Sequence, residues 1–208
     1  MDGDPKIPAQ ILGDGAAPAT AAARLAAAAL RPITLVGLMG AGKSSIGKRL
    51  AQRLGLPFAD ADTEIEAAAG LSIPEIFERF GEAHFRDGER RVIARLIDGL
   101  PKVIATGGGA FMNDETRTLI LARTQAVWLN AEVSTLVDRV RRRGNRPLLA
   151  GRDPGQVLAE LAAIRNPVYA LAPIQVLSLP GPHHAMVEAI IAALAAANAN
   201  IVAAGEPT

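Results

Sequence analysis

The sequence has no cysteine, few aromatic residues and almost no net charge, and each shortage excludes a class of protein. Without cysteine the chain has no disulfide and no thiolate metal site, which fits a reducing compartment. Its 22 basic and 21 acidic residues leave a net charge of +1, so no overall field attracts nucleic acid or an acidic membrane. Aromatic residues make up 3% of the chain, too few for basic patches interleaved with rings that stack on bases.

Long apolar runs are missing as well. No stretch approaches the roughly 20 residues needed to span a bilayer. Residues 1–31 lack the continuous apolar core of a signal peptide, and they carry three acidic residues, Asp2, Asp4 and Asp14. We therefore expect a cytoplasmic protein that binds neither membrane nor nucleic acid.

The composition and its changes along the chain predict one domain with two tails. Half of the 208 residues are hydrophobic, which is enough for a single sizeable core. We expect an N-terminal extension over residues 1–31 that is disordered or partly helical, one domain over residues 32–197, and a flexible tail over residues 198–208. The two ends are rich in Ala, Gly and Pro without periodicity, which is why they are assigned to tails.

The most informative segment present is Gly37–Ser44, in which a glycine is followed by four residues and then Gly-Lys-Ser. The apolar run Ile33–Val36 precedes it and predicts a buried strand. After it, apolar residues recur every four positions, which predicts a helix with one buried face: Ile46, Leu50 and Leu54. A glycine-rich turn with a chance lysine is the alternative, but the flanking strand and helix favour a phosphate-binding loop.

Such a loop directs backbone N–H groups and the positive end of a helix at phosphate oxygens. Lys43 would then reach the β- and γ-phosphates, and the Ser44 hydroxyl would bind Mg²⁺. The loop therefore predicts ATP or a similar nucleotide as a ligand, with Mg²⁺ as cofactor.

Strands and helices alternate through the rest of the domain, which is typical of an α/β fold with a parallel sheet covered on both faces. We expect a three-layer fold of the phosphate-loop type around five parallel strands, at residues 33–36, 56–59, 102–105, 126–129 and 174–177. The expected later helices are Glu64–Ala69, Ile73–Phe80, Glu82–Ile97, one that places Val133, Leu136, Val137 and Val140 inward, Pro154–Leu171 with a bend at Pro167, and His184–Ala197. Arg139 is expected near the outer side of its helix, and Gly144–Gly155 is expected to be a loop.

Polar or glycine-rich residues follow the first three of these strands. Ligands of open α/β sheets bind beyond the carboxyl ends of the strands, so we expect these residues to converge. Asp60 and Asp62 alternate at a strand end, so only one of them faces the loop, and Asp62 is equally compatible with a helix N-cap and with a functional role. Gly107–Gly109 is either a flexible turn or a site where a ligand approaches the backbone, and the entropy cost of three glycines favours the second.

Three arginines could each be no more than a charge at the surface. Arg86 lies three residues before Glu89 on a predicted helix, where the pair could be a surface ion pair of little value. Arg146 lies in the loop Gly144–Gly155, either as a solvated charge or as part of a lid that closes on a phosphoryl group. Arg165 could likewise be only a charge on a helix surface.

Taken together, these elements resemble shikimate kinase, a family of small-molecule kinases with the phosphate-loop fold. The resemblance covers the chain from Ile33 to about Leu194. The matching pieces occur in the family's order and spacing: Gly37–Ser44, Phe58–Asp62, Gly81–Glu89, Thr106–Gly109, Arg146–Leu149 and Arg165–Tyr169. Many nucleotide-binding proteins share the first motif, whereas the combination is far more restrictive.

The resemblance implies transfer of the γ-phosphoryl group of ATP to the 3-hydroxyl of shikimate, in aromatic amino-acid biosynthesis, by a monomer. It implies that ATP contacts Gly40, Ala41, Gly42, Lys43, Ser44, Ser45 and the lid residue Arg146. It implies that shikimate contacts Asp62, Arg86, Gly108, Gly109 and Arg165. Mg²⁺ would be held by Ser44 directly and by Asp60 through water, and the catalytic residues would be Lys43, Asp62 and Arg146.

The sequence departs from the family at two places. Pro173 stands where the family usually has alanine, four residues after the tyrosine of Arg-x-Pro-x-Tyr. Leu179–Pro182 lacks the polar residues that often lie beside adenine, so no residue is assigned to that contact. A gluconate-type kinase is the nearest alternative, but it has no particular need for Asp62, Arg86 and Arg165 together. A nucleotide-binding module without transfer activity is the alternative from another class.

Overall fold

Five parallel strands form one sheet in the order β2-β3-β1-β4-β5, seen in the computed structural model, which describes residues 31–141, 152–179 and 181–204. The strands are β1 (Ile33–Val36), β2 (Phe58–Asp60), β3 (Val103–Ala105), β4 (Gln125–Asn130) and β5 (Ile174–Leu177). β1 lies at the centre, between β3 and β4, and all four of its residues are buried. A parallel sheet covered on both faces requires apolar residues at successive positions, which explains the unbroken run in β1. The predicted five-stranded parallel sheet is confirmed.

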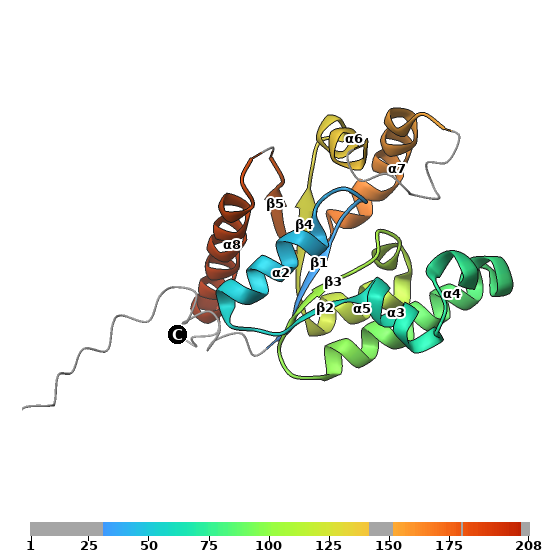
Figure 1. Ribbon diagram of the computed structural model, residues 1–208. Helices are drawn as coiled ribbons and strands as arrows, with labels where there is room; N and C mark the ends of the chain where they lie inside the picture. The colour runs from blue at the N-terminus through green and yellow to red at the C-terminus, as the bar shows by residue number, and fades with distance from the viewer. Residues whose placement is uncertain (1–30, 142–151, 180, 205–208) are drawn as a thin grey trace, which may run out of the picture.

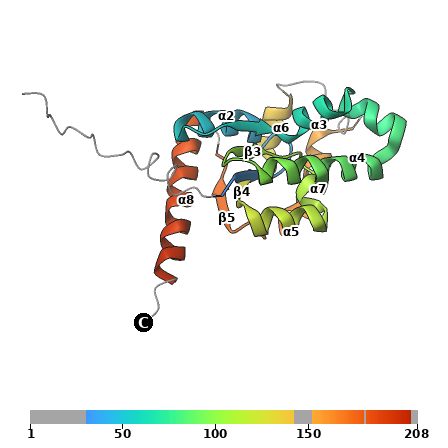
Figure 2. The ribbon, with the colours of Figure 1, turned by 90° about the horizontal axis from the view of Figure 1, so that it is seen from below.

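Helices cover both faces of this sheet (Figures 1 and 2). The helices are α2 (Lys43–Leu54), α3 (Ala61–Ala69), α4 (Ile73–Asp98), α5 (Asp114–Arg123), α6 (Val133–Arg141), α7 (Pro154–Tyr169) and α8 (His183–Ala204), with a short 3₁₀ helix η1 (Ala110–Met112). On one face α2 packs against β1, β2 and β3 and against α8, while α5 lies on the other face against β4 and α4. α3 pairs with α4, and α6 pairs with α7.

The helix α4 combines two helices that the sequence predicts separately. Ser72 caps its start, because its hydroxyl accepts the N–H of Glu75 while the Glu75 carboxylate accepts the N–H of Ser72. At Gly81 the backbone leaves helical geometry, with φ 79° and ψ 174°, a conformation that favours glycine. The position of the predicted break, near residue 81, is therefore confirmed, but the two predicted helices are joined there through a kink.

Other boundaries differ from the prediction. The second strand is Phe58–Asp60, where the expected strand began at Leu56. Neither η1 nor α5 was predicted. α7 begins at Pro154, as expected, and continues through Pro167, but it ends at Tyr169, before the expected end at Leu171. α8 runs on to Ala204, beyond the expected end at Ala197.

Some predictions fall on parts of the chain outside the described residues: most of the N-terminal extension, the end of the C-terminal tail, and most of the expected lid together with Arg146. Across the helices that are described, none is both long enough and apolar enough to cross a membrane.

The carboxyl ends of the parallel strands meet at one edge of the sheet, on the side of α6 and α7 in Figure 1. β1 leads into the glycine-rich loop, β2 ends at Asp60, and β3 leads into Thr106 and the three glycines. β5 ends just before Ser178 on the same edge. The topology therefore brings together the segments that the sequence singles out.

Candidate active site

The glycine-rich loop between β1 and α2 is packed so closely that glycine is required at its start. Gly37 has φ 137°, and a Cβ atom there would lie 2.8 Å from the Leu129 carbonyl oxygen of β4. Gly40 also has a positive φ, and its added Cβ would lie 3.0 Å from Val140 of α6. The loop is thus held between the centre of the sheet and α6, which fixes the direction of its backbone N–H groups.

Lys43 is the first residue of α2 and is buried at 9% exposure. Its Nζ donates to the carbonyl oxygens of Gly37, at 2.7 Å, and of Leu38, at 3.0 Å. These carbonyls compensate for burying the ammonium group, which otherwise carries a high desolvation penalty. The positive charge is therefore held inside the loop, at the N-terminal end of α2, where an anion is also stabilised by the helix dipole.

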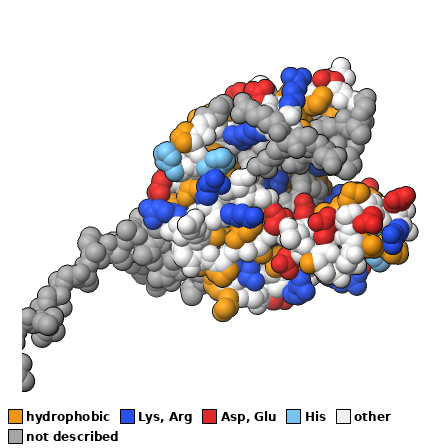
Figure 3. All heavy atoms as spheres, in the orientation of Figure 1, with side chains coloured by type: hydrophobic (Ala, Val, Ile, Leu, Met, Phe, Trp, Pro, Cys, Tyr) orange, Lys and Arg blue, Asp and Glu red, His pale blue; other side chains and the backbone are white. Residues whose placement is uncertain are grey.

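A small pocket of about 90 Å³ opens beside this loop. It is lined by Met39, Gly40, Gly42, Lys43, Ser44, Asp62, Thr106, Gly107 and Gly108. Lys43 and Ser44 of the predicted phosphate loop therefore share one cavity with Asp62 and Gly108, two of the predicted acceptor residues. On the molecular face in Figure 3, acidic side chains gather over the part that carries α3 and α4.

Asp60 ends β2 and Asp62 lies in the following helix, so the two aspartates do not alternate along one strand as expected. Asp60 is the N-cap of α3, because its Oδ1 accepts the N–H of Asp62 at 3.2 Å. Asp62 lies in the first turn of α3 and lines the pocket with Lys43 and Ser44. The N-cap interpretation of Asp62 was therefore wrong, since the residue two positions earlier caps the helix.

The triple-glycine turn after β3 is bound through all three of its carbonyl oxygens. The Gly107 oxygen accepts the N–H of Ala110 at 3.3 Å, and the Gly109 oxygen accepts the N–H of Met112 at 3.0 Å. The Gly108 oxygen accepts two side-chain donors from α7, the guanidinium of Arg165 at 3.2 Å and the hydroxyl of Tyr169 at 2.5 Å.

Arg86 reaches the same turn from α4. A Cβ atom on Gly109 would lie 2.6 Å from both terminal nitrogens of Arg86, so the guanidinium lies directly against the glycine backbone. Arg165 contacts Gly108 from α7. Two guanidinium groups thus flank one short turn, an arrangement suited to a carboxylate.

The partner of Arg86 is Glu89, and the pair is not a surface ion pair. The Glu89 side chain is 2% exposed, and its Oε2 accepts from Arg86 Nη1 at 2.8 Å. Burial raises the pKa of Glu89, and Arg86 offsets this only in part. For Arg86, burial alone would lower the pKa, but the hydrogen bonds and charges of Glu89 and Glu82 outweigh it, so the pKa is raised.

Glu89 also faces the turn. An added Cβ on Gly107 would lie 3.1 Å from Glu89 Oε1 and 2.7 Å from Asp62 Oδ1. The negative charge of Asp62 adds to the raised pKa of Glu89. Glycine is required at position 107 because two carboxylates approach it, and the turn is thereby packed between acidic and basic groups.

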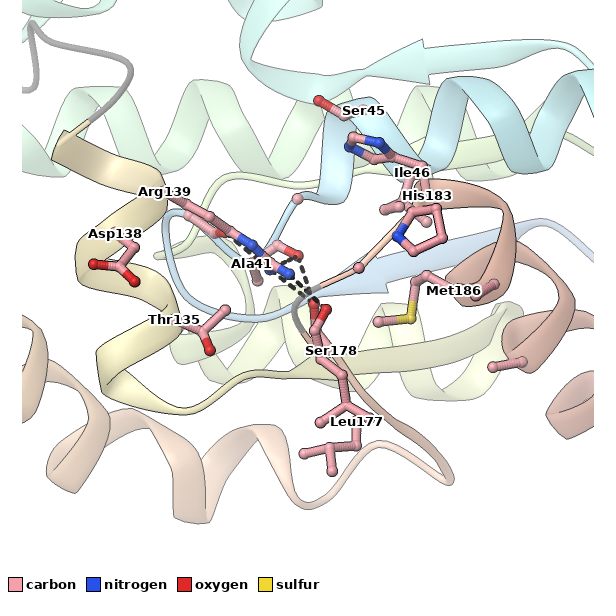
Figure 4. Close-up of a pocket in the computed structure, with 17 residues that line it drawn as sticks. Ala41, Ser45, Ile46, Thr135, Asp138, Arg139, Leu177, Ser178, His183 and Met186 are labelled. Atoms are coloured by element: carbon pink, nitrogen blue, oxygen red, sulfur yellow. Dashed lines mark hydrogen bonds between the residues drawn. The ribbon is translucent and has the colours of Figure 1, made fainter.

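A larger pocket of about 590 Å³ lies on the other side of the phosphate loop, between α6 and the segment that joins β5 to α8 (Figure 4). Its lining includes apolar side chains such as Ile46, Leu177 and Met186, and it reaches the backbone of Gly40–Gly42. The volume and the mostly apolar walls suit a small-molecule ligand of the size of a nucleoside.

Arg139 crosses this pocket, where the sequence had placed it near the outer side of its helix. Its guanidinium donates to Ser178 Oγ at 2.8 Å, to the Leu179 carbonyl at 3.0 Å and to the Ala41 carbonyl at 3.4 Å (Figure 4). Burial lowers the pKa of Arg139. The side chain therefore links α6, the phosphate loop and the segment after β5.

Three residues of this region were not assigned roles from the sequence: Glu89, Arg139 and Tyr169. Glu89 and Tyr169 lie inside quoted motifs, and Tyr169 is the only tyrosine in the chain. Arg139 gave no comparable signal, because the direction of a long side chain depends on the neighbouring loop. Arg146 lies outside the described residues, so its position relative to either pocket is not described.

A lysine-containing phosphate loop, a pocket of nucleoside size and a glycine turn contacted by two arginines are the features of a small-molecule kinase of the phosphate-loop fold. Residues 39–195 match the family model of shikimate kinase. A shikimate kinase from Zymomonas mobilis subsp. mobilis is 57% identical over 164 residues, which cover 79% of this chain and 93% of that protein. One from Caulobacter vibrioides is 60% identical over 169 residues, which cover 81% and 84%. The chain therefore belongs to the shikimate kinase family and is an ATP-dependent kinase.

Solved structures agree. The shikimate kinase from Acinetobacter baumannii in complex with shikimate matches with a TM-score of 0.77 and 38% identity, covering 83% of this chain and 98% of that one. A gluconokinase from Sinorhizobium meliloti 1021 matches with a TM-score of 0.60, 19% identity and coverage of 85% and 98%. The second likeness is one of fold alone. The resemblance inferred from the motifs is thus confirmed.

Proposed function

We propose that this chain transfers the γ-phosphoryl group of ATP to the 3-hydroxyl of shikimate. The observation that carries the proposal is the shared pocket in which Lys43 and Ser44 lie beside Asp62 and the triple-glycine turn. A phosphate donor and a hydroxyl acceptor would meet there. Phosphoryl transfer depends chiefly on positioning and charge neutralisation, which these groups can supply.

The acceptor end of the site suits a small anion with several hydroxyl groups. Arg86 and Arg165 flank the turn and would grip the carboxylate of shikimate, with the N–H groups of Gly108 and Gly109 nearby. Asp62 would accept hydrogen bonds from the hydroxyl groups at the other end. A charged carboxylate beside the reacting hydroxyl can orient it and take its proton as the bond to phosphorus forms.

The donor end suits a nucleoside triphosphate. Gly40, Ala41 and Gly42 would present their N–H groups to the phosphates, and Lys43 would neutralise the developing charge on the γ-phosphoryl oxygens. The base and ribose would lie in the larger pocket beside Ser45, with Arg139 along one wall. This pocket supports an assignment that the sequence left open, since Leu179 and Pro182 also line it.

The oxygen donors in the smaller pocket fit Mg²⁺. The Ser44 hydroxyl and the Asp62 carboxylate line it, and Asp60 precedes Asp62 at the start of α3. Mg²⁺ prefers oxygen ligands and keeps several waters, so one hydroxyl and a carboxylate acting through water, together with phosphate, are an adequate set. When bound, Mg²⁺ would neutralise charge on the β- and γ-phosphates. We assign the direct contact to Ser44 and the water-mediated one to Asp60.

Arg146 is proposed as the residue that meets the transferring phosphoryl group from the lid, on the basis of its place in the family motif. A positive side chain that arrives with the substrate would stabilise charge that develops in the transition state.

A coupled assay for ADP release tests the proposal. The purified full-length protein is supplied with ATP and Mg²⁺ and with shikimate, gluconate or a nucleoside monophosphate as acceptor. Of these acceptors, we expect only shikimate to support turnover. A Lys43→Met variant should lose that turnover, which controls for a contaminating kinase. No turnover with shikimate at millimolar concentration would overturn the proposal. Turnover with gluconate would instead favour the alternative kinase.

A further inference from the structure

The hydroxyl group of Tyr169 is buried beneath the acceptor site, and the proposed reaction does not use it. Tyr169 lies at the end of α7 and is fully buried. Its hydroxyl donates to the carbonyl oxygen of Gly108 at 2.5 Å, across 61 residues of sequence. Arg165, one helical turn earlier, donates to the same oxygen at 3.2 Å. One carbonyl in the centre of the triple-glycine turn therefore receives two donors from one face of α7.

The ring of Tyr169 has little freedom to move. It is stacked with the ring of Phe111 of η1, at a centroid distance of 6.2 Å and an interplanar angle of 22°, and with that of Trp128 of β4, at 6.1 Å and 27°. Both neighbours are buried, as is Tyr169 itself. Close packing of a buried side chain keeps it in one rotamer, so the hydroxyl is held in one place. Burial raises the pKa of Tyr169 to about 12, so the hydroxyl keeps its proton and acts as a donor at neutral pH.

Glycine has the greatest backbone freedom of any residue, and three in succession need external contacts to hold one conformation. The outer two carbonyls of the turn are bound by backbone N–H groups that follow directly in the chain. The central carbonyl is bound by side chains from α7. Because the peptide group is planar, holding the Gly108 oxygen toward Tyr169 also fixes the direction of the Gly109 N–H, which faces away from Tyr169.

We propose that Tyr169 is a positioning residue that sets the acceptor-binding conformation of the Gly107–Gly109 turn and keeps Arg165 available for the acceptor's carboxylate. Tyr169 supplies the shorter of the two bonds to the Gly108 oxygen. Without the Tyr169 hydroxyl, Arg165 is the side-chain donor left for the buried Gly108 carbonyl oxygen. Its guanidinium is then drawn toward that oxygen and away from the substrate's carboxylate. This inference rests on the proposed function, because it concerns the binding of the same acceptor.

The test compares Tyr169→Phe with wild type in the full-length enzyme. We expect KM for shikimate to rise about five- to twentyfold, the low end of the range for an unsatisfied buried acceptor, because Arg165 still serves the oxygen in part. KM for ATP and kcat should change little, because the phosphate loop is untouched. Replacing Tyr169 by 4-aminophenylalanine, which retains a donor at the ring tip, should restore most of the affinity for shikimate.

Thr124→Val is the matched control. Thr124 is also buried, and its hydroxyl donates to the Ile120 carbonyl at 2.8 Å in α5, so the variant loses a similar hydrogen bond elsewhere. We expect a comparable loss of thermal stability with an unchanged KM for shikimate. The inference is overturned if Tyr169→Phe has the wild-type KM for shikimate, if its KM values for both substrates rise equally, or if it fails to fold while Thr124→Val folds. A wild-type enzyme that does not phosphorylate shikimate would overturn the proposed function as well, so the two failures are distinguishable.

Discussion

Replacing Gly109 by alanine should displace Arg86 without straining the backbone. Gly109 has φ −94° and ψ −18°, a region that alanine adopts readily. The new Cβ would lie 2.6 Å from both terminal nitrogens of Arg86 and 2.8 Å from its Cζ. Since unstrained contacts of this kind need about 3.5 Å, the guanidinium must withdraw by about 1 Å. The change therefore tests one contact, that between the turn and Arg86.

The size of the effect follows from this geometry. A shift of about 1 Å removes a charge-assisted hydrogen bond between Arg86 and the substrate carboxylate, which is worth about 1.5–3 kcal/mol. With about 1.4 kcal/mol for each factor of ten, kcat/KM for shikimate should fall about 10- to 100-fold. Arg86 is partly exposed but is paired with the buried Glu89, so its withdrawal should cost at least about 1 kcal/mol of stability and lower Tm by at least about 2–4 °C.

Initial rates at varied shikimate and fixed, saturating ATP measure the effect, with KM for ATP as the internal reference. Gly88→Ala is the matched control. Gly88 lies in α4, two residues after Arg86, and an added Cβ there meets nothing within 4 Å. It should leave the rates unchanged and raise Tm by about 1–4 °C, since alanine favours the helix. A Gly109→Ala enzyme with wild-type KM for shikimate would refute the assignment of Arg86 to the carboxylate.

Further substitutions and one titration test other parts of the structure. Asp62→Asn should mainly lower kcat, by about 10²- to 10⁴-fold, whereas Arg165→Ala should mainly raise KM for shikimate, by about 10- to 100-fold. Steady-state kinetics distinguish the two variants. If the Asp62→Asn enzyme has the wild-type kcat, Asp62 has no part in the mechanism. Gly37→Ala should lower Tm in calorimetry by at least about 4 °C, because its φ is 137° and the new Cβ would lie 2.8 Å from the Leu129 oxygen; an unchanged Tm would contradict this packing. Tyr169, the only tyrosine, should ionise with a pKa of about 12 in the folded protein and near 10 in urea, as followed by phenolate absorbance. Because the folded pKa is the higher one, its contribution to stability is intact below pH 10 and is lost as the pH rises through about 12. A folded-state midpoint near 10 would show that the ring is exposed.

The sequence predicts the central elements of the fold well because burial there leaves a simple pattern. β1 and β5 have the predicted bounds. Over residues 183–199 of α8, where burial is described, the buried residues are the five that the periodicity indicates: Met186, Val187, Ile190, Ile191 and Leu194. α5 was missed because only Thr116 and Ile120 of its residues are buried, too few for a visible period. Its N-cap Asn113, followed by two acidic residues, was the available signal.

Site residues that belong to a sequence motif could be predicted. Those whose burial or side-chain direction depends on tertiary contacts could not. The spacing of Gly37–Ser44 places Lys43 and Ser44, and the topology then brings Asp62 to them. The burial of Glu89 could not be inferred, because a three-residue spacing from Arg86 is equally common on a helix surface. The direction of Arg139 depends on carbonyl groups of a loop 98 residues away, which no local pattern encodes.

Trp128 is the only tryptophan in the chain, and its place between the two halves of the site gives the enzyme a built-in optical reporter. On one side its ring is stacked with Tyr169, the residue bound to the acceptor turn, and on the other its Cδ1 lies 3.4 Å from where a Cβ of Gly37 would be. It is 6% exposed, so bulk solvent contributes little to its emission. We therefore expect the emission of this single unlabelled fluorophore to change when the proposed nucleotide side or the proposed acceptor side is filled.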